Sequence, residues 1–209
     1  MLEVEVKFKL RDKEEFEEDL KRIGAKYVVD IIHKDTYYNL PKCVRDFTKT
    51  DEVLRLRRIE EFNIRVTKAV AHAIKADLTY KGPKIDTETK TRKELITPIE
   101  NPDEMDMILR SLDIRPILTL TKYRRLYTLD MEKHHIEVLI DKIEHLAGYH
   151  GECEIMASSE KEMEEGKRIL FDLMEKLGYS KTDSILTSYL ELVIMKLIEK
   201  GELSPEDIA

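Results

Sequence analysis

The start of the chain alternates apolar and charged residues without a break, and this pattern constrains the fold more than any other feature. Residues 2–9 read Leu-Glu-Val-Glu-Val-Lys-Phe-Lys. A period of two predicts a β-strand with one apolar face and one charged face. Similar alternation, with charges of both signs, returns in at least five later segments. Strands that all carry charge on one face need either open water or a shared polar interior.

The same reading predicts further strands and four helices. Three of the helix starts carry capping signals, at Asp12, Asn101 and Ser159. The other expected strands cover residues 26–38, 52–60, 78–81, 90–94, 115–129, 133–143 and 151–157. The fourth helix is expected at about residues 184–200.

The segments between these elements are expected to be less regular. Residues 39–50 are predicted to form a loop, residues 61–76 an extended hairpin, and Gly82-Pro83 a turn. The C-terminal helix is apolar over most of its circumference between Tyr189 and Ile198, so it should pack on the rest of the chain or at a dimer contact. About eight strands with polar inward faces favour a closed or nearly closed barrel, because closure removes exposed edges.

Composition limits the partners and the compartment. Charged residues make up 38% of the 209 residues and the net charge is −7, which argues against non-specific binding of nucleic acid. The chain has two cysteines without a CxxC spacing and no signal-peptide pattern, which favours a reduced, cytoplasmic location. No apolar run approaches the length of a transmembrane helix, so no membrane partner is expected.

The charged faces of the strands contain more basic than acidic groups. They are Lys7, Arg55, Arg57, Lys81, Lys90, Arg92, Lys122 and Arg124 against Glu3, Glu5, Glu94, Asp141, Glu152 and Glu154. If all of them face one cavity, an excess of two positive charges would be costly to bury empty. A polyphosphate bound with a divalent cation would bring the sum close to neutral, since Arg and Lys suit phosphate oxygens and carboxylates suit Mg²⁺ or Mn²⁺. A set of solvated β-faces with ion-pair ladders is the alternative.

The order of these motifs resembles the CYTH family, also called triphosphate tunnel metalloenzymes. Glu3-Val4-Glu5-Val6-Lys7 resembles its ExExK signature. The later matches are Leu54-Arg55-Leu56-Arg57, Leu78-Thr79-Tyr80-Lys81-Gly82-Pro83, Lys90-Thr91-Arg92-Lys93-Glu94, Lys122-Tyr123-Arg124, Asp141 and Glu152-Cys153-Glu154. Asp35-Thr36-Tyr37-Tyr38 and Ser188-Tyr189-Leu190-Glu191-Leu192 are similar to the branch that contains the class IV (CyaB-like) adenylate cyclases.

The resemblance implies an α+β fold, with an eight-stranded antiparallel β-barrel as a tunnel and helices packed outside, in a single domain over residues 1–209. The implied phosphate ligands are Lys7, Arg55, Arg57, Lys81, Arg92, Lys122 and Arg124. The implied ligands of Mg²⁺ or Mn²⁺ are Glu3, Glu5, Asp141, Glu152 and Glu154. The implied catalytic residues are Glu5, Lys7, Tyr37, Glu94 and Lys122, with Tyr37 either helping to activate water or packing at the barrel mouth.

Several activities fit this resemblance. The branch motifs favour a metal-dependent adenylate cyclase that converts ATP to cyclic AMP and pyrophosphate. A phosphohydrolase acting on thiamine triphosphate, a nucleoside triphosphate or tripolyphosphate is the first alternative, and a non-catalytic polyphosphate-binding protein is the second. The chain departs from the family pattern at His150-Gly151, where an aromatic and an aliphatic residue are common, and in the long stretch between Arg57 and Lys81.

Overall fold

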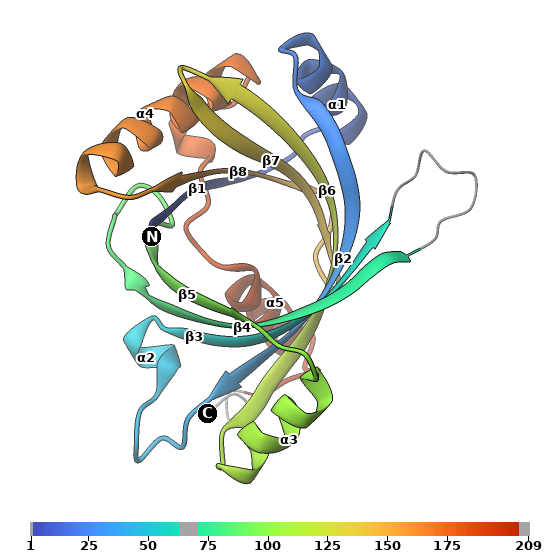
Figure 1. The fold of residues 1–209 in the computed structure, drawn as a ribbon, viewed down its shortest axis with the longest axis vertical. Coiled ribbons are helices and arrows are strands. Elements are labelled where there is room, and N and C mark those ends of the chain that lie inside the picture. The colour runs from blue at the N-terminus through green and yellow to red at the C-terminus, as the bar shows by residue number, and fades with distance from the viewer. Residues whose placement is uncertain (1, 63–70, 205–209) are drawn as a thin grey trace.

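The eight strands of the protein close into one antiparallel barrel in the computed structural model, which describes residues 2–62 and 71–204 (Figure 1). Around the barrel the strand order is β1-β5-β4-β3-β2-β6-β7-β8. The strands are β1 Leu2–Lys9, β2 Lys26–Asn39, β3 Val53–Phe62, β4 Ala71–Lys84, β5 Arg92–Pro98, β6 Arg115–Met131, β7 His134–Ile143 and β8 His150–Ala157. The helices are α1 Lys13–Arg22, α2 Phe47–Thr50, α3 Pro102–Ser111, α4 Glu160–Lys176 and α5 Tyr189–Glu199, with a 3₁₀ turn, η1, at Lys181–Asp183. The predicted α+β barrel with helices outside is confirmed.

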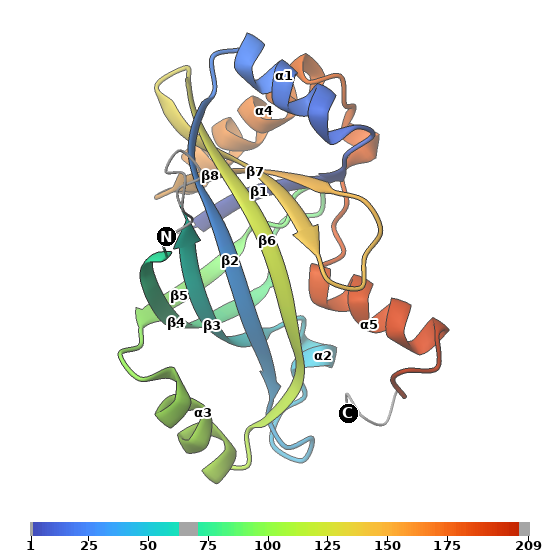
Figure 2. The ribbon, with the colours of Figure 1, turned by 90° about the vertical axis from the view of Figure 1, so that its right-hand side faces the viewer.

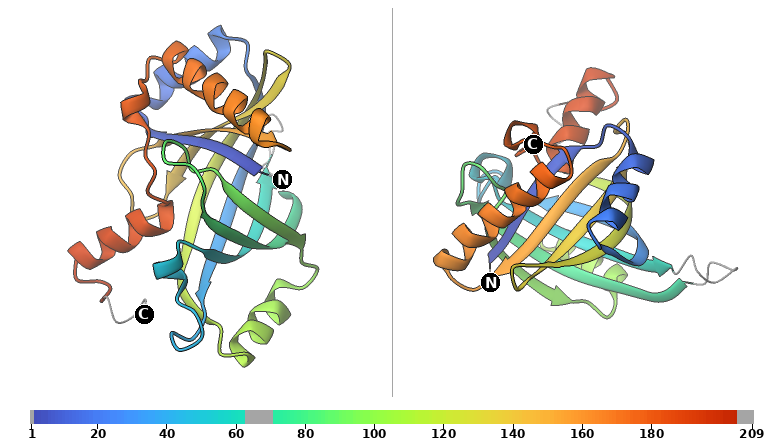
Figure 3. Two further views of the ribbon diagram at one scale, coloured as in Figure 1. Left: turned by 90° about the vertical axis from the view of Figure 1, so that its left-hand side faces the viewer. Right: turned by 90° about the horizontal axis from the view of Figure 1, so that it is seen from above.

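The main hydrophobic core lies outside the barrel wall, under α1 and α4. Val4, Val6 and Phe8 of β1 are completely buried there, together with apolar residues of β7, β8, α1 and α4. Figures 2 and 3 show α1 and α4 together at one end of the long axis, with α3 near the other end. Since the apolar positions of β1 point outward into this core, the charged positions must point into the barrel. The alternation seen in the sequence therefore separates a core outside from a polar interior.

Helix capping follows the sequence signals. The Asp12 side chain accepts a hydrogen bond from the Glu15 backbone N–H at 2.8 Å at the start of α1. Asn101 and Ser159 cap α3 and α4 in the same way. Gly178 follows α4 with a φ of 79°, a conformation that glycine adopts without strain.

The predicted turn at Gly82-Pro83 is wrong. β4 continues through both residues to Lys84, and its pairing with β5 shifts register between Lys81 and Lys84. The recorded pairing of β4 with β3 ends at Val53 opposite Lys81. Pro83 lacks an N–H, and a bulge beyond the end of β3 is a place where a strand tolerates that loss.

Other boundaries also differ from the sequence prediction. A short helix, α2, lies within the segment 39–50 that was predicted to be loop. Lys90 precedes β5 instead of lying on it. The C-terminal helix begins at Tyr189, because residues 184–188 are extended and the Ile185 N–H donates to the Lys7 carbonyl at 2.7 Å. Of the expected hairpin at 61–76, Phe62 and Ala71 pair across β3 and β4, and residues 63–70 lie outside the described part.

The helix α5 packs on one side of the barrel. Tyr189, Val193 and Leu197 form a second apolar cluster with Leu120 of β6 and Ile143 of β7. This contact brings the first turn of α5 to the barrel interior. Among the helices of residues 2–62 and 71–204, none has the length and apolarity needed to cross a membrane.

Candidate active site in the barrel interior

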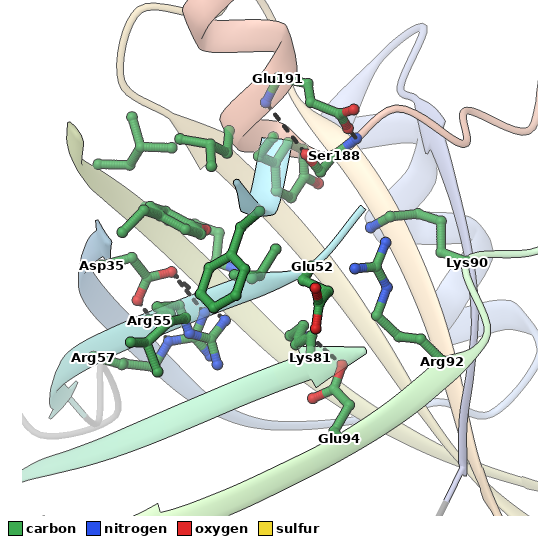
Figure 4. Close-up of a pocket in the computed structure, with 18 of the residues that line it drawn as sticks. Asp35, Glu52, Arg55, Arg57, Lys81, Lys90, Arg92, Glu94, Ser188 and Glu191 are labelled. Atoms are coloured by element: carbon green, nitrogen blue, oxygen red, sulfur yellow. Dashed lines mark hydrogen bonds and ion pairs between the residues drawn. The ribbon is translucent and has the colours of Figure 1, made fainter. Parts of the chain in front are cut away.

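A cavity of about 280 Å³ occupies the barrel interior and is lined mainly by charged side chains (Figure 4). Its strand-borne polar lining consists of Glu3, Glu5, Asp35, Tyr37, Arg55, Arg57, Asp77, Lys81, Arg92, Glu94, Lys122, Arg124, Glu152 and Glu154. The first turns of α2 and α5 complete the wall, and Figure 4 shows Ser188 and Glu191 of α5 above the strands. The strand periodicity thus delivers polar side chains from seven of the eight strands to one space, and Ile143 adds an apolar one from the eighth strand, β7.

Three carboxylates gather at one place in this cavity. One carboxylate oxygen from each of Glu3, Glu5 and Glu154 lies within 4.8 Å of the others. Burial, and then the neighbouring Glu152, raise the pKa of Glu5, while burial and the neighbouring Glu3 raise the pKa of Glu154 well above its ordinary value. Carboxylates that repel one another in this way would be stabilised by a hard divalent cation. The chemistry and spacing of the three fit such an ion.

Asp141 and Glu152 lie outside this group and contact a guanidinium instead. Arg124 donates from Nε and Nη2 to the two oxygens of Asp141, at 2.8 and 2.7 Å, and from Nη2 to Glu152. Lys122 Nζ lies 3.5 Å from the Asp141 carboxylate. Burial works against ionisation of Glu152, but Arg124 and Lys122 hold its pKa well below the ordinary value. Of the five predicted metal ligands, Glu3, Glu5 and Glu154 therefore cluster together. Asp141 and Glu152 hydrogen-bond to Arg124, whose Nη1 also lies 3.8 Å from Glu154.

The arginines of β3 have carboxylate partners on both neighbouring strands. Arg57 forms a two-point ion pair with Asp35 of β2, with Nε–Oδ1 at 2.6 Å and Nη2–Oδ2 at 2.7 Å. Arg55 lies 3.9 Å from both Asp35 and Asp77, and its Nη2 donates to the Thr79 hydroxyl at 3.1 Å. The side chains of both arginines are about nine-tenths buried, so they are positive groups held inside the barrel by pairing.

Two lysines carry lowered pKa values. Burial, and then Lys90, lower the pKa of Lys7 to about 7. Burial, and then Arg124, lower the pKa of Lys122 to about 8. The Lys7 ammonium donates to the Thr187 carbonyl and lies 4.2 Å from the centroid of the Tyr189 ring, and Lys122 Nζ lies 5.5 Å from the same centroid. Lys122 lines the cavity, whereas Lys7 is not among the lining residues and lies over the ring of Tyr189, which is. An anion entering the cavity would favour the charged form of both lysines.

The remaining predicted phosphate ligands, Lys81 and Arg92, also pair with acidic groups. Lys81 contacts Glu94 directly and lies 3.8 Å from Glu3. Arg92 lies 3.4 Å from Asp51, in the turn before β3. Figure 4 places Arg92 and Lys90 on the side of the cavity opposite Asp35 and Arg57.

Tyr37 is among the residues that line the cavity. Its hydroxyl is unsuited to act as a base, since burial, and then Asp35, raise its pKa to about 12. A protonated phenol can still donate a hydrogen bond to a phosphate oxygen or to water.

Sequence reasoning missed three residues of this site as functional candidates. Asp35 and Asp77 alternate with residues that do face the cavity, so the period of two could have identified them. Tyr189 lies in a helix, where that signal is absent. Lys90 was expected to face the cavity from a strand, and it does so from the loop before β5. With the two aspartates, the eight basic side chains of the sequence analysis meet eight carboxylates, so the expected excess of positive charge is not found among the described residues.

The comparisons with known proteins agree with this geometry. The model of the CYTH domain matches residues 1–189. A protein of Methanocaldococcus jannaschii with the provisional name adenylate cyclase is 36% identical over 192 residues, which is 92% of this chain and 98% of that protein. The solved structure of a Pyrococcus horikoshii OT3 protein, 32% identical, superposes with a TM-score of 0.77 over 95% of this chain and 99% of that one.

A more distant structure shows the same fold. A protein from Hippeastrum, 15% identical, has a TM-score of 0.59 over 97% of this chain and 98% of its own. The family match includes all eight strands of the barrel and reaches the first residue of α5. The chain belongs to the CYTH domain family.

Proposed function

We propose that this protein is a divalent-metal-dependent enzyme that binds a triphosphate substrate inside the barrel and transfers a phosphoryl or nucleotidyl group. The observation that carries the proposal is the meeting of two kinds of group in one cavity. A cluster of three carboxylates lies beside a set of buried arginines and lysines, all of them facing the same 280 Å³. Phosphoryl transfer depends mainly on positioning and on stabilisation of charge, and these are what such a set of side chains supplies.

Glu3, Glu5 and Glu154 would hold Mg²⁺ or Mn²⁺. When bound, such an ion would neutralise phosphate charge and lower the pKa of an attacking hydroxyl or water. The raised pKa values of Glu5 and Glu154 support this assignment, because a cation would relieve the repulsion that the neighbouring carboxylates, Glu152 among them, exert on these two groups. Glu152 and Asp141 hold Arg124 in place, which orients its guanidinium toward the cavity.

The basic side chains would receive the phosphate oxygens. Arg55, Arg57 and Arg124 offer planar donors that match phosphate, and Lys7, Lys81 and Lys122 offer point charges. Each is paired with a carboxylate or a carbonyl in the protein, so binding exchanges existing partners for phosphate oxygens. Arg92 and Glu94, which also line the cavity, would orient the chain of phosphates or its substituent.

A cyclase is the activity that the relatives favour. The M. jannaschii relative carries that provisional name and is 36% identical over nearly its whole length. For a cyclase, the α-phosphate of ATP must meet the ribose 3′-hydroxyl. The Hippeastrum structure, by contrast, is described as revealing a dominant triphosphatase activity in that protein, and hydrolysis of the γ-phosphate is our second candidate. Tyr37 favours this candidate, because a protonated phenol inside the cavity can orient a water molecule.

Phosphorus NMR with Mg²⁺ or Mn²⁺ would decide between these reactions. ATP, thiamine triphosphate and tripolyphosphate would be supplied separately. Cyclic AMP with pyrophosphate from ATP would identify a cyclase, and orthophosphate from any of the three would identify a phosphohydrolase. Intact substrates in every sample, for a protein that still binds them, would overturn the enzymatic proposal in favour of a binding protein.

A further inference from the structure

We infer that the Lys90 ammonium is an internal counter-ion for the metal-binding carboxylates. A divalent cation that binds these carboxylates displaces the ammonium, and the displaced ammonium then binds the triphosphate. The inference rests on the proposed function and adds to it a phosphate ligand and an order of events. In this structure the Lys90 ammonium contacts the Glu5 carboxylate directly and lies 3.9 Å from Oε1 of Glu152. Its side chain is 11% exposed, so the charge is committed to the cavity.

The loop that carries Lys90 is built to aim this side chain inward. The Lys90 backbone N–H donates to the Glu5 carbonyl at 3.1 Å. Asp86, at the outer end of the loop, accepts hydrogen bonds from the backbone N–H groups of Glu88 and Thr89 at 2.8 and 2.7 Å. The other oxygen of Asp86 lies 2.9 Å from Lys167 Nζ on α4.

These contacts fix both ends of the loop, so the direction of the Lys90 side chain does not depend on its contact with Glu5. The loop is anchored to α4 on the outside and to β1 on the inside. If Glu5 is taken by another cation, the lysine remains inside the barrel and must find another anion there. A displaced ammonium buried without a counter-ion would be strongly unfavourable.

The neighbours of Lys90 indicate where it would go. The centroid of the Tyr189 ring lies 5.9 Å from Lys90 Nζ, 4.2 Å from Lys7 Nζ and 5.5 Å from Lys122 Nζ. The three ammonium groups thus lie around one aromatic ring at the inner end of α5. Lys7 and Lys122 are assigned to phosphate oxygens, and Lys90 is close enough to share the same anion. Its four-carbon stem allows the small movement that this requires.

The inference predicts that removing the charge of Lys90 raises the affinity for Mn²⁺ and lowers the affinity for a triphosphate. Lys90→Met keeps the length of the side chain and removes its charge. With Mn²⁺ alone, the variant should bind the ion more tightly than the wild-type protein, by about tenfold, because Glu5 no longer has a competing partner. With Mn²⁺ at saturation, the variant should bind imidotriphosphate, a non-hydrolysable triphosphate, about tenfold more weakly, because one charged hydrogen bond is lost.

Electron paramagnetic resonance would measure free Mn²⁺, and calorimetry would measure binding of imidotriphosphate. Lys93→Met is the matched control, since Lys93 is an exposed lysine on β5 only three residues away, and it should change neither constant. Lys90→Arg keeps the charge and should keep the imidotriphosphate affinity within about threefold of wild type. Lys90→Gln should reproduce the Lys90→Met result if that variant folds poorly.

The result that would overturn the inference is an Mn²⁺ affinity that is unchanged or lower, or an imidotriphosphate affinity within twofold of wild type, in a folded charge-removing variant. Such a result would leave the proposed function intact, because the wild-type protein would still bind both ligands. A wild-type protein that binds neither Mn²⁺ nor imidotriphosphate would overturn the proposed function together with this inference.

Discussion

Arg57 and Asp35 lie directly opposite each other on β3 and β2 and join through two hydrogen bonds inside the barrel, at 2.6 and 2.7 Å. The Asp35 side chain is 4% exposed and that of Arg57 is 12% exposed. Burial alone would disfavour the carboxylate, but Arg57 and Arg55 hold the Asp35 pKa well below its ordinary value. Asp35 thus stands in the place of an anion that the two arginines would otherwise bind.

Removing the Asp35 carboxylate should destabilise the protein and make its stability depend more strongly on a bound triphosphate. Asp35→Asn keeps the shape of the side chain but leaves Arg57 buried without a full counter-ion. We expect the free energy of unfolding to fall by about 3–5 kcal/mol. Tripolyphosphate should recover part of this loss, so urea denaturation should show a larger stabilisation by ligand in the variant than in the wild-type protein.

A nearby pair provides the control for this experiment. Arg58 and Asp103 also form an ion pair, at 2.6 Å, but the Asp103 side chain is 84% exposed. Asp103→Asn should change stability little, because exposed pairs contribute little. Equal losses in the two variants would show that burial of Asp35 does not matter, contrary to our account.

Binding of a triphosphate at pH 8 should take up protons. The pKa values of Lys7 and Lys122 are about 7 and 8, so Lys7 is mostly neutral and Lys122 partly neutral at that pH. Phosphate oxygens favour the charged forms and raise both pKa values, so each lysine gains a fraction of a proton on binding. For the same reason the affinity for the triphosphate should fall as pH rises from 7 to 9. A growing fraction of the two lysines is then neutral and must take up a proton before it can bind phosphate oxygens.

Calorimetry in buffers with different heats of ionisation would count these protons, with Mg²⁺ already at saturation so that the carboxylates do not contribute. Lys122→Met should reduce the uptake, and Lys161→Met, at an exposed position on α4, should leave it unchanged. Release of protons, or an affinity that rises with pH, would contradict the assignment of these lysines to the phosphates.

The sequence predicts the faces of the strands well, because side-chain alternation is a local property. It identified Val4, Val6 and Phe8 as one face of β1 and the charged residues as the other, and the structure buries the first set outside the barrel. It does not predict which charges meet, since that depends on the register between strands. Arg124 pairs with Asp141 because β6 and β7 place these two residues opposite each other.

The remaining errors arise where no periodicity exists. Lys90 lies in a loop, and its contact with Glu5 depends on how Asp86 anchors that loop to α4. Gly82-Pro83 carries a strong turn signal, yet pairing of the chain with β5 keeps it in a strand. Both features depend on contacts between residues that are far apart in the sequence, and a single sequence does not show which residues make such contacts.

The group of three carboxylates should be essential for turnover but not for folding. Glu5→Gln and Glu154→Gln each remove one negative charge from a cluster whose members repel one another. We expect each variant to lose Mn²⁺ affinity and turnover by about 100-fold or more while remaining folded. Thermal stability should equal or exceed that of the metal-free wild-type protein in Glu154→Gln, and should be lower in Glu5→Gln, because Lys90 loses the carboxylate that it contacts.

Glu164→Gln, at an exposed position on α4, is the control and should behave as wild type in all three measurements. Unchanged turnover in both Glu5→Gln and Glu154→Gln would remove these residues from the metal site.

The buried ring of Phe8 explains why a glycine, Gly151, stands directly before the acidic pair of β8. A Cβ atom at Gly151 would lie 2.6 Å from Cε2 and 2.7 Å from Cζ of Phe8, whose side chain is completely buried. Gly151→Ala should therefore lower the free energy of unfolding by about 1–3 kcal/mol through overpacking. Because Glu152 follows directly, the displaced strand should also weaken the contact of Glu152 with Arg124 and raise the KM for a triphosphate.

A double-mutant cycle with Phe8→Leu tests this cause. The smaller side chain makes room for the new methyl group, so the double variant should be more stable than the sum of the two single losses predicts. Gly82→Ala is the control, since its nearest new contact would be an ordinary 3.7 Å to the Lys93 carbonyl, and it should change stability little. Additive losses in the cycle would mean that the Phe8 ring does not exclude a side chain at position 151, and the glycine would need another explanation.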